Sequence, residues 1–201
     1  MKRYCLTSLM LLALVATAWS ANNKRQIILH VESPPLPYCD SHVAQKLKVQ
    51  LSRKVDLRVS LAQEINGMLP PLPASSYDLD SLLNWGQEAG GRYLVLVDID
   101  REGLKRKKTI HIPLIAHKYE NVGVIEGELR LIDISRSKLL AAEAFSVEMK
   151  GSKIFQATMD DDINDPDLHL TAPDKIRFFG RMETKLSEKL VSRIHALIGG
   201  R

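Results

Sequence analysis

The stretch GQEAGGRYLVLVDI (Gly86–Ile99) indicates the fold class most clearly, because it joins the end of a helix directly to an apolar strand. Gly90 and Gly91 are expected to end the helix, since a helix C-cap favours a residue that adopts a positive φ angle. The strand that follows is apolar at nearly every position, which is typical of a strand buried on both faces. We therefore expect an α/β protein in which this strand lies at the centre of the sheet.

Two strands and two helices are expected before the central strand. The segment Gln26–Glu32 predicts a first strand, and the strict alternation of Val55–Leu61 predicts an edge strand with one wetter face. Between these strands, a helix is predicted by the four-residue spacing of Val43, Leu47 and Leu51. Its N-terminal cap is expected to be Asp40 or Ser41. Either residue of Ser75–Ser76 is expected to cap the helix that leads into the central strand.

Two long strands and a last helix are expected after the central strand. A charged excursion, 101–119, leads into strands at 121–134 and 138–149, which a short polar turn joins. Thr171 and Asp174 have the spacing of a capping box at the start of the last helix. Its apolar stripe comprises Met182, Leu186, Leu190, Ile194 and Ile198, and the polar residues Glu183, Lys185, Lys189 and Ser192 lie largely off that stripe. The predicted order is β-α-β-α-β-β-β-α, a single mixed β-sheet of about five strands flanked by helices.

The first twenty residues have the pattern of a cleavable signal peptide. Lys2 and Arg3 form a positive n-region, and the apolar run Leu6–Ala18 is shorter than the roughly 20 residues that a membrane-spanning helix needs. Small residues allow cleavage after Ala18 or after Ser20. We expect residues 1–20 to be removed and residues 21–201 to form one domain, with no transmembrane span after signal removal.

Charge and cysteine content exclude several classes of protein. Without the two basic residues of the signal peptide, the mature chain has 26 Lys and Arg and 24 Asp and Glu, which gives a net charge of +2. This charge is too small to favour a nucleic-acid partner. Cys39 is then the only cysteine, which rules out an internal disulfide and argues against a metal–thiolate site. No cofactor is indicated.

Three motifs resemble a superfamily of bacterial envelope α/β domains. They are the glycine turn at Gly86, Gly90 and Gly91 with the strand Tyr93–Val97 behind it, the strand Leu129–Asp133, and the returning strand Lys138–Ala144. The superfamily includes the curli-secretion channel subunit, the lipoprotein activator of penicillin-binding proteins and the N-terminal domain of the Tol propeller protein. This chain lacks the lipidated cysteine of the channel family. The resemblance implies a mixed sheet flanked by helices and a periplasmic, non-enzymatic binding or assembly module.

The densest positive patch is the candidate binding site. It comprises Arg101 and the tetrad Lys105, Arg106, Lys107 and Lys108. A patch of this charge on a projecting loop suits an anionic envelope polymer, a lipid headgroup or an acidic face of an envelope protein. Because no aromatic residues are interleaved with it, single-stranded nucleic acid is not indicated. The alternative is a solvated hairpin tip with no partner.

Two further clusters allow other functions. The acidic segment Asp160–Asp167 has the oxygen content of a calcium loop, but it departs from the EF-hand pattern, and a solvated loop is the alternative. An exported hydrolase would need a site assembled from distant residues. Its first suspects are Asp98, Asp100, His111 and His117. No spacing in the sequence nominates a catalytic set or a metal-binding set, so we expect a protein that is not an enzyme.

Overall fold

The computed structural model describes residues 26–36, 40–65, 69–73, 78–112, 116–156 and 170–199, and it describes no side chains within 106–112, 116–119 and 152–156. The proposed signal peptide and the acidic segment Asp160–Asp167 therefore lie outside the described residues. Five strands form one mixed sheet in the order β2-β1-β3-β4-β5. The strands are β1 (Gln26–Glu32), β2 (Arg58–Leu61), β3 (Gly91–Ile112), β4 (Ala116–Asp133) and β5 (Lys138–Gln156).

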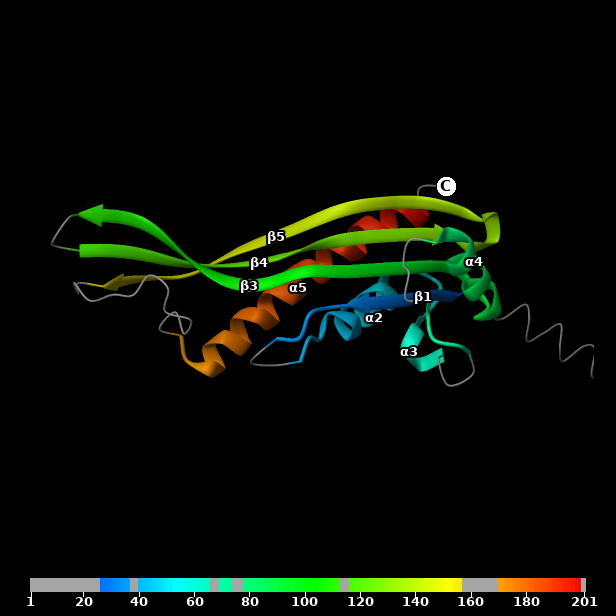
Figure 1. Cartoon of the computed structure of the whole chain (residues 1–201), viewed down its shortest axis with the longest axis horizontal. Coiled ribbons are helices and arrows are strands. Elements are labelled where there is room, and N and C mark those ends of the chain that lie inside the picture. The colour runs from blue at the N-terminus through cyan, green and yellow to red at the C-terminus, as the bar shows by residue number, and fades with distance from the viewer. Residues whose placement is uncertain are drawn as a thin grey trace, which may run out of the picture.

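Helices cover both faces of one end of the sheet. The helices α2 (Val43–Lys54) and α5 (Ala172–Gly199) lie on one face, and the short α3 (Ala62–Ile65) and α4 (Leu79–Glu88) contribute to the core on the other. Figure 1 shows β3, β4 and β5 running beyond these helices as a long antiparallel arm. The predicted fold class, a single mixed five-stranded sheet flanked by helices, is confirmed.

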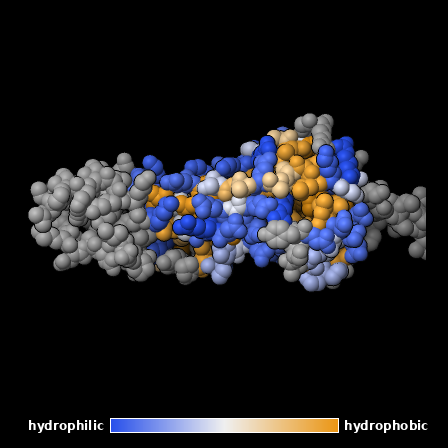
Figure 2. Space-filling view, turned by 45° about the horizontal axis from the view of Figure 1, so that its top comes forward, coloured by the Kyte–Doolittle hydropathy of each residue, from blue (hydrophilic) through white to orange (hydrophobic). Residues whose placement is uncertain are grey.

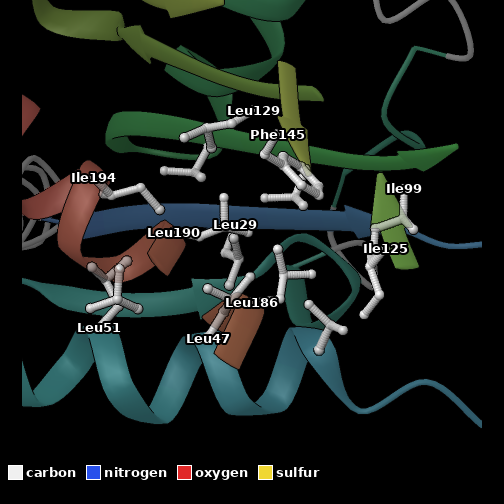
Figure 3. Packing of buried hydrophobic residues seen from close by; sticks show 14 of the residues in the cluster. Leu29, Leu47, Leu51, Ile99, Ile125, Leu129, Phe145, Leu186, Leu190 and Ile194 are labelled. Carbon is white, nitrogen blue, oxygen red and sulfur yellow. The ribbon is translucent and has the colours of Figure 1, made fainter. Parts of the chain in front are cut away.

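The larger core lies between the sheet and the helix pair α2–α5. Leu47 and Leu51 of α2 and Leu186 of α5 are fully buried, as the four-residue spacing of both helices predicts. In Figure 3 these side chains and those of Leu29 and Leu129 from the sheet point toward one another. Helix α5 begins at the predicted capping box, because the Asp174 amide donates to Thr171 Oγ1 at 3.3 Å.

The glycine turn joins α4 to β3 as the sequence predicts. Gly90 has a φ angle of 68°, which a residue with a side chain rarely adopts. A Cβ atom on Gly91 would lie 3.0 Å from Cγ1 of Ile28 in the neighbouring strand β1, so a side chain at position 91 would displace the Ile28 side chain. The helix itself starts later than expected, since Asp78 rather than a serine accepts the Asp80 amide at 3.2 Å.

Three expected strand lengths are wrong, and one of them is that of β5, which continues to Gln156 and does not end at 149. The edge strand β2 comprises only Arg58–Leu61 and not the expected Val55–Leu61. Helix α2 continues to Lys54, so residues 55–57 form the turn between this helix and the strand. The excursion 101–119 is not a loop, since β3 continues to Ile112 and β4 begins at Ala116. Backbone hydrogen bonds to β4 hold this charged stretch extended, although no apolar alternation marks it.

Candidate functional site

A cavity lies where the parallel strands β1 and β3 leave the helix-covered part of the sheet. Its volume is about 500 Å³, and His30, Glu32, Gln63, Leu72, Leu96 and Asp98 are among the residues that line it. Open α/β sheets bind ligands beyond the carboxyl ends of their parallel strands. The position of this cavity and its polar lining make it the candidate functional site.

Three carboxylates form a row across the sheet at this cavity. Glu32 of β1 is the register partner of Asp98 in β3, and Asp98 is the register partner of Glu128 in β4. Neighbouring strands lie about 4.8 Å apart, and like charges directly opposite each other are destabilising. The row therefore opposes folding, and a charge that compensates it from outside would stabilise the protein.

The charges in the row are unequally compensated. Arg130 donates to both carboxylate oxygens of Glu128, at 2.6 Å and 2.9 Å. Glu32 and Asp98 form no ion pair with any basic side chain of the described ranges. Burial raises the pKa of Asp98, and the nearby carboxylates of Asp100 and Glu32 raise it further, while Arg130 opposes this change. The negative charge that remains accordingly centres on Glu32 and Asp98.

His30 supplies a neutral polar group to the same cavity. Burial lowers the pKa of its imidazole, while Glu32 and Asp98 oppose that change. Its Nδ1 atom is buried and has no hydrogen-bond partner among the described residues. A histidine with a lowered pKa is uncharged near neutral pH, so it can exchange one hydrogen bond with a ligand but does not neutralise the carboxylates.

A bulge next to Asp98 fixes the shape of this region. The register between β3 and β4 shifts between Ile99 and Arg101, opposite Gly127. A Cβ atom on Gly127 would meet the Asp98 carbonyl oxygen and would lie 2.9 Å from Cα of Ile99. Only glycine allows the two strands to approach this closely, and bulges of this kind commonly redirect side chains beside functional sites.

The residues suspected for a hydrolase do not converge. Asp98 lines the cavity and Asp100 is exposed beyond it, whereas His111 and His117 are register partners near the other end of the β3–β4 hairpin. The 13 positions from Asp98 to His111, at about 3.3 Å each, span roughly 40 Å. The hypothesis of one site built from these four residues is therefore wrong. Sequence reasoning also missed His30 and Glu32, which only the pairing of β1 with β3 brings to Asp98, and Gln63, which α3 places at the same cavity.

The basic tetrad lies in a strand and not on a loop. Lys105 is exposed, and Arg101 is exposed and lies 3.9 Å from a carboxylate oxygen of Glu126. Positions 106–108 pair in register with 121–119 of β4. Consecutive strand positions alternate between the two faces of a sheet, so four of them in a row do not form one contiguous patch. The role of Arg101 and Lys105–Lys108 in binding remains a prediction.

We expect the tetrad to affect binding to an anionic partner and not stability. Replacing Lys105, Arg106, Lys107 and Lys108 with serine should weaken retention on an anionic polymer such as heparin and flatten its salt dependence. The free energy of unfolding should change by less than about 1 kcal/mol, because exposed ion pairs contribute little. An unchanged elution midpoint would show that the tetrad is only a solubilising segment.

Neither a cluster of metal-ligating side chains nor a membrane-spanning helix is found in the part of the chain that the structure describes. Within it, no group of three or more His, Cys, Asp or Glu side chains is placed to hold a metal ion. None of the helices described is both long and apolar enough to cross a membrane. The calcium hypothesis concerns residues outside these ranges and stays a prediction.

An α/β domain with a strand-end cavity is the class that this geometry defines. No protein-family model matches the sequence, and no curated protein sequence matches it either. Among solved structures, a hypothetical protein from Chlamydia trachomatis is 12% identical, with 89% of this chain and 99% of that chain covered and a TM-score of 0.47.

Two proteins from Acinetobacter baumannii have a similar architecture. A minor lipoprotein is 10% identical, with 86% of this chain and 93% of that chain covered and a TM-score of 0.43. TolB is 13% identical with a TM-score of 0.41, and the match covers 88% of this chain but only 29% of TolB. At such identities and TM-scores the likeness is one of general architecture and transfers no property of those proteins.

Proposed function

We propose that this chain is an exported, non-enzymatic binding module of the bacterial cell envelope, and that its strand-end cavity binds a basic segment of a partner protein. The cavity of about 500 Å³ at the ends of β1 and β3 carries the proposal. The signal-like residues 1–20 support export, with 21–201 as the mature domain, and the resemblance to envelope domains favours the periplasm.

The lining of the cavity suits a lysine or arginine side chain. Glu32 and Asp98 supply negative charge, and no Lys or Arg is among the lining residues that the structure describes. Leu72, Pro73 and Leu96 supply apolar surface in the same cavity. A long basic side chain has an apolar stem and a charged end, so it matches both parts of this lining. An anionic polymer would meet like charge here and does not fit this cavity.

Binding is supported better than catalysis. A catalytic histidine is normally oriented by a second group that holds one of its ring nitrogens. His30 Nδ1 has no such partner in the described ranges, and Ser33 is the only serine among the described residues that line the cavity. These observations support a role for His30 in accepting or donating one hydrogen bond to a bound partner.

The experiment is a calorimetric titration of the purified protein with an oligolysine peptide. We expect binding that weakens about tenfold or more in Asp98→Asn and in Glu32→Gln, since hydrogen bonds to charged groups contribute about 1.5–3 kcal/mol. Glu88→Gln is the matched control, because Glu88 is an exposed acid at the end of α4 and does not line the cavity. Its affinity should equal that of the wild-type protein.

The pH dependence of the same titration is a second readout. Only the ionised Asp98 attracts a cation, and its pKa is raised, so affinity should fall as the pH is lowered toward that pKa. The Asp98→Asn protein should lose most of this dependence. The proposed ligand class would be refuted if the wild-type protein and the Asp98→Asn, Glu32→Gln and Glu88→Gln variants bound oligolysine with equal affinity. Tighter binding of oligoglutamate than of oligolysine would refute it as well.

A further inference from the structure

The two edges of the sheet are very different in length. At one edge β2 has 4 residues, whereas at the other β5 has 19. An edge strand presents a row of unpaired N–H and C=O groups to any other extended chain, and short edges limit this hazard. The long edge at β5 therefore needs another form of protection.

Two lysines of α5 occupy part of this edge. Lys185 Nζ donates to the Glu148 carbonyl oxygen, and Lys189 Nζ donates to the Ser146 carbonyl oxygen, both at 2.9 Å. Glu148 and Ser146 are two residues apart, so their carbonyl groups point to the same side of the strand. The ammonium groups of Lys185 and Lys189 come from α5, outside the sheet, and they reach both carbonyl oxygens. These carbonyl groups therefore point away from β4.

The spacing of the helix matches that of the strand. Four helical residues rise about 6 Å, and two strand residues rise about 6.7 Å, so successive turns of α5 meet alternate carbonyl groups of β5. One turn further along, Arg193 Nε donates to the Glu143 side chain at 2.8 Å. Basic residues at 185, 189 and 193 thus follow the edge of β5 over about two helical turns.

We infer that Lys185 and Lys189 prevent the β5 edge from pairing with the β5 strand of a second copy of this chain. Two identical edge strands related by a twofold axis pair antiparallel, so the surface is self-complementary. Ala142, Ala144 and Ser146 are small and exposed along this strand, and they set no steric barrier to such pairing. The two lysine hydrogen bonds occupy carbonyl groups that the second strand would need.

The test compares the association state of variants of the full mature chain by sedimentation velocity over a range of concentrations. In Lys185→Met/Lys189→Met the donors are lost while helix propensity and side-chain length are kept. We expect its weight-average mass to rise with concentration toward twice the wild-type value. Lys185→Arg/Lys189→Arg retains donors and should sediment like the wild-type protein.

Two further variants show whether the association uses the edge. Adding Ser146→Pro to the double methionine variant should restore wild-type sedimentation, because proline at an edge removes the outward N–H group. Arg53→Met/Lys54→Met removes the same amount of charge from α2 and should not associate. The inference is overturned if the methionine variant sediments like wild type, if proline does not reverse its association, or if the α2 control associates equally.

Discussion

Replacing Leu131 with alanine should lower the free energy of unfolding by about 2–5 kcal/mol, the range for truncating a fully buried leucine. Leu131 is 0% exposed and lies in β4 within the core that α2 and α5 cover. Leu131 is the register partner of Val95 in β3 and of Ala141 in β5, so strands on both sides hold its backbone in place when the side chain is truncated. The loss is read from urea unfolding of the variant and the wild-type protein.

Leu139→Ala is the matched control for this prediction. Leu139 is 40% exposed at the start of β5. Figure 2 shows that the hydrophobic side chains of the face in view gather mainly at the end of the molecule that carries α4. Truncation at an exposed position should lower the free energy of unfolding by less than about 1 kcal/mol. Equal losses for the two leucines would mean that β4 does not lie at the centre of the core.

Glu102→Gln should stabilise the protein above neutral pH. Both carboxylate oxygens of Glu102 are buried and have no hydrogen-bond partner among the described residues. Burial raises its pKa to about 7, with a contribution from Glu183 that Lys46 opposes. Glu183 itself accepts hydrogen bonds from Lys46 Nζ at 2.6 Å and from the His42 amide at 2.8 Å.

The sign of the effect follows from the raised pKa. Below the unfolded value of 4.5 Glu102 is protonated in both states, and between 4.5 and about 7 the unfolded chain releases a proton that the folded chain keeps. Stability is therefore lost as the pH rises through this window. We expect Gln to recover about 1–3 kcal/mol at pH 8, less than the full shift implies because the group is partly exposed.

Urea unfolding from pH 4 to pH 8 measures this recovery. Glu126→Gln is the control, since its partly exposed side chain lies on the same hairpin and makes only a long contact to Arg101. Its stability should follow the wild-type pH profile. If the Glu102→Gln profile also runs parallel to that of the wild-type protein, Glu102 is not the buried acid that the structure describes.

Local patterns predicted the helix-bearing half of the fold. The four-residue spacing of Leu47 and Leu51, the glycine turn at Gly90 and the capping box at Thr171 each reflect short-range physics that a sequence carries directly. The arm formed by the far halves of β3 and β4 could not be predicted in this way. Its strands show no apolar alternation, so a charged run such as Lys105–Lys108 has the pattern of a loop.

The site depends on contacts between distant segments and was only partly predictable. Asp98 was a candidate because it follows an apolar strand, but Glu32 joins it only through the parallel register of β1 and β3. Glu183 was expected to lie off the apolar stripe of α5, yet it is 3% exposed because Lys46 of α2 neutralises it. Pairings of this kind become visible only when the elements are placed beside each other.

The proposed binding site is tested most directly by an NMR titration of the isotopically labelled protein with the oligolysine peptide. We expect the largest amide shift changes to fall on residues at the ends of β1 and β3, around His30, Glu32 and Asp98, and to disappear in Asp98→Asn. Shift changes confined to α2, α5 or the far end of the β3–β4 hairpin, or none at all, would contradict the claim that the strand-end cavity binds a cationic partner.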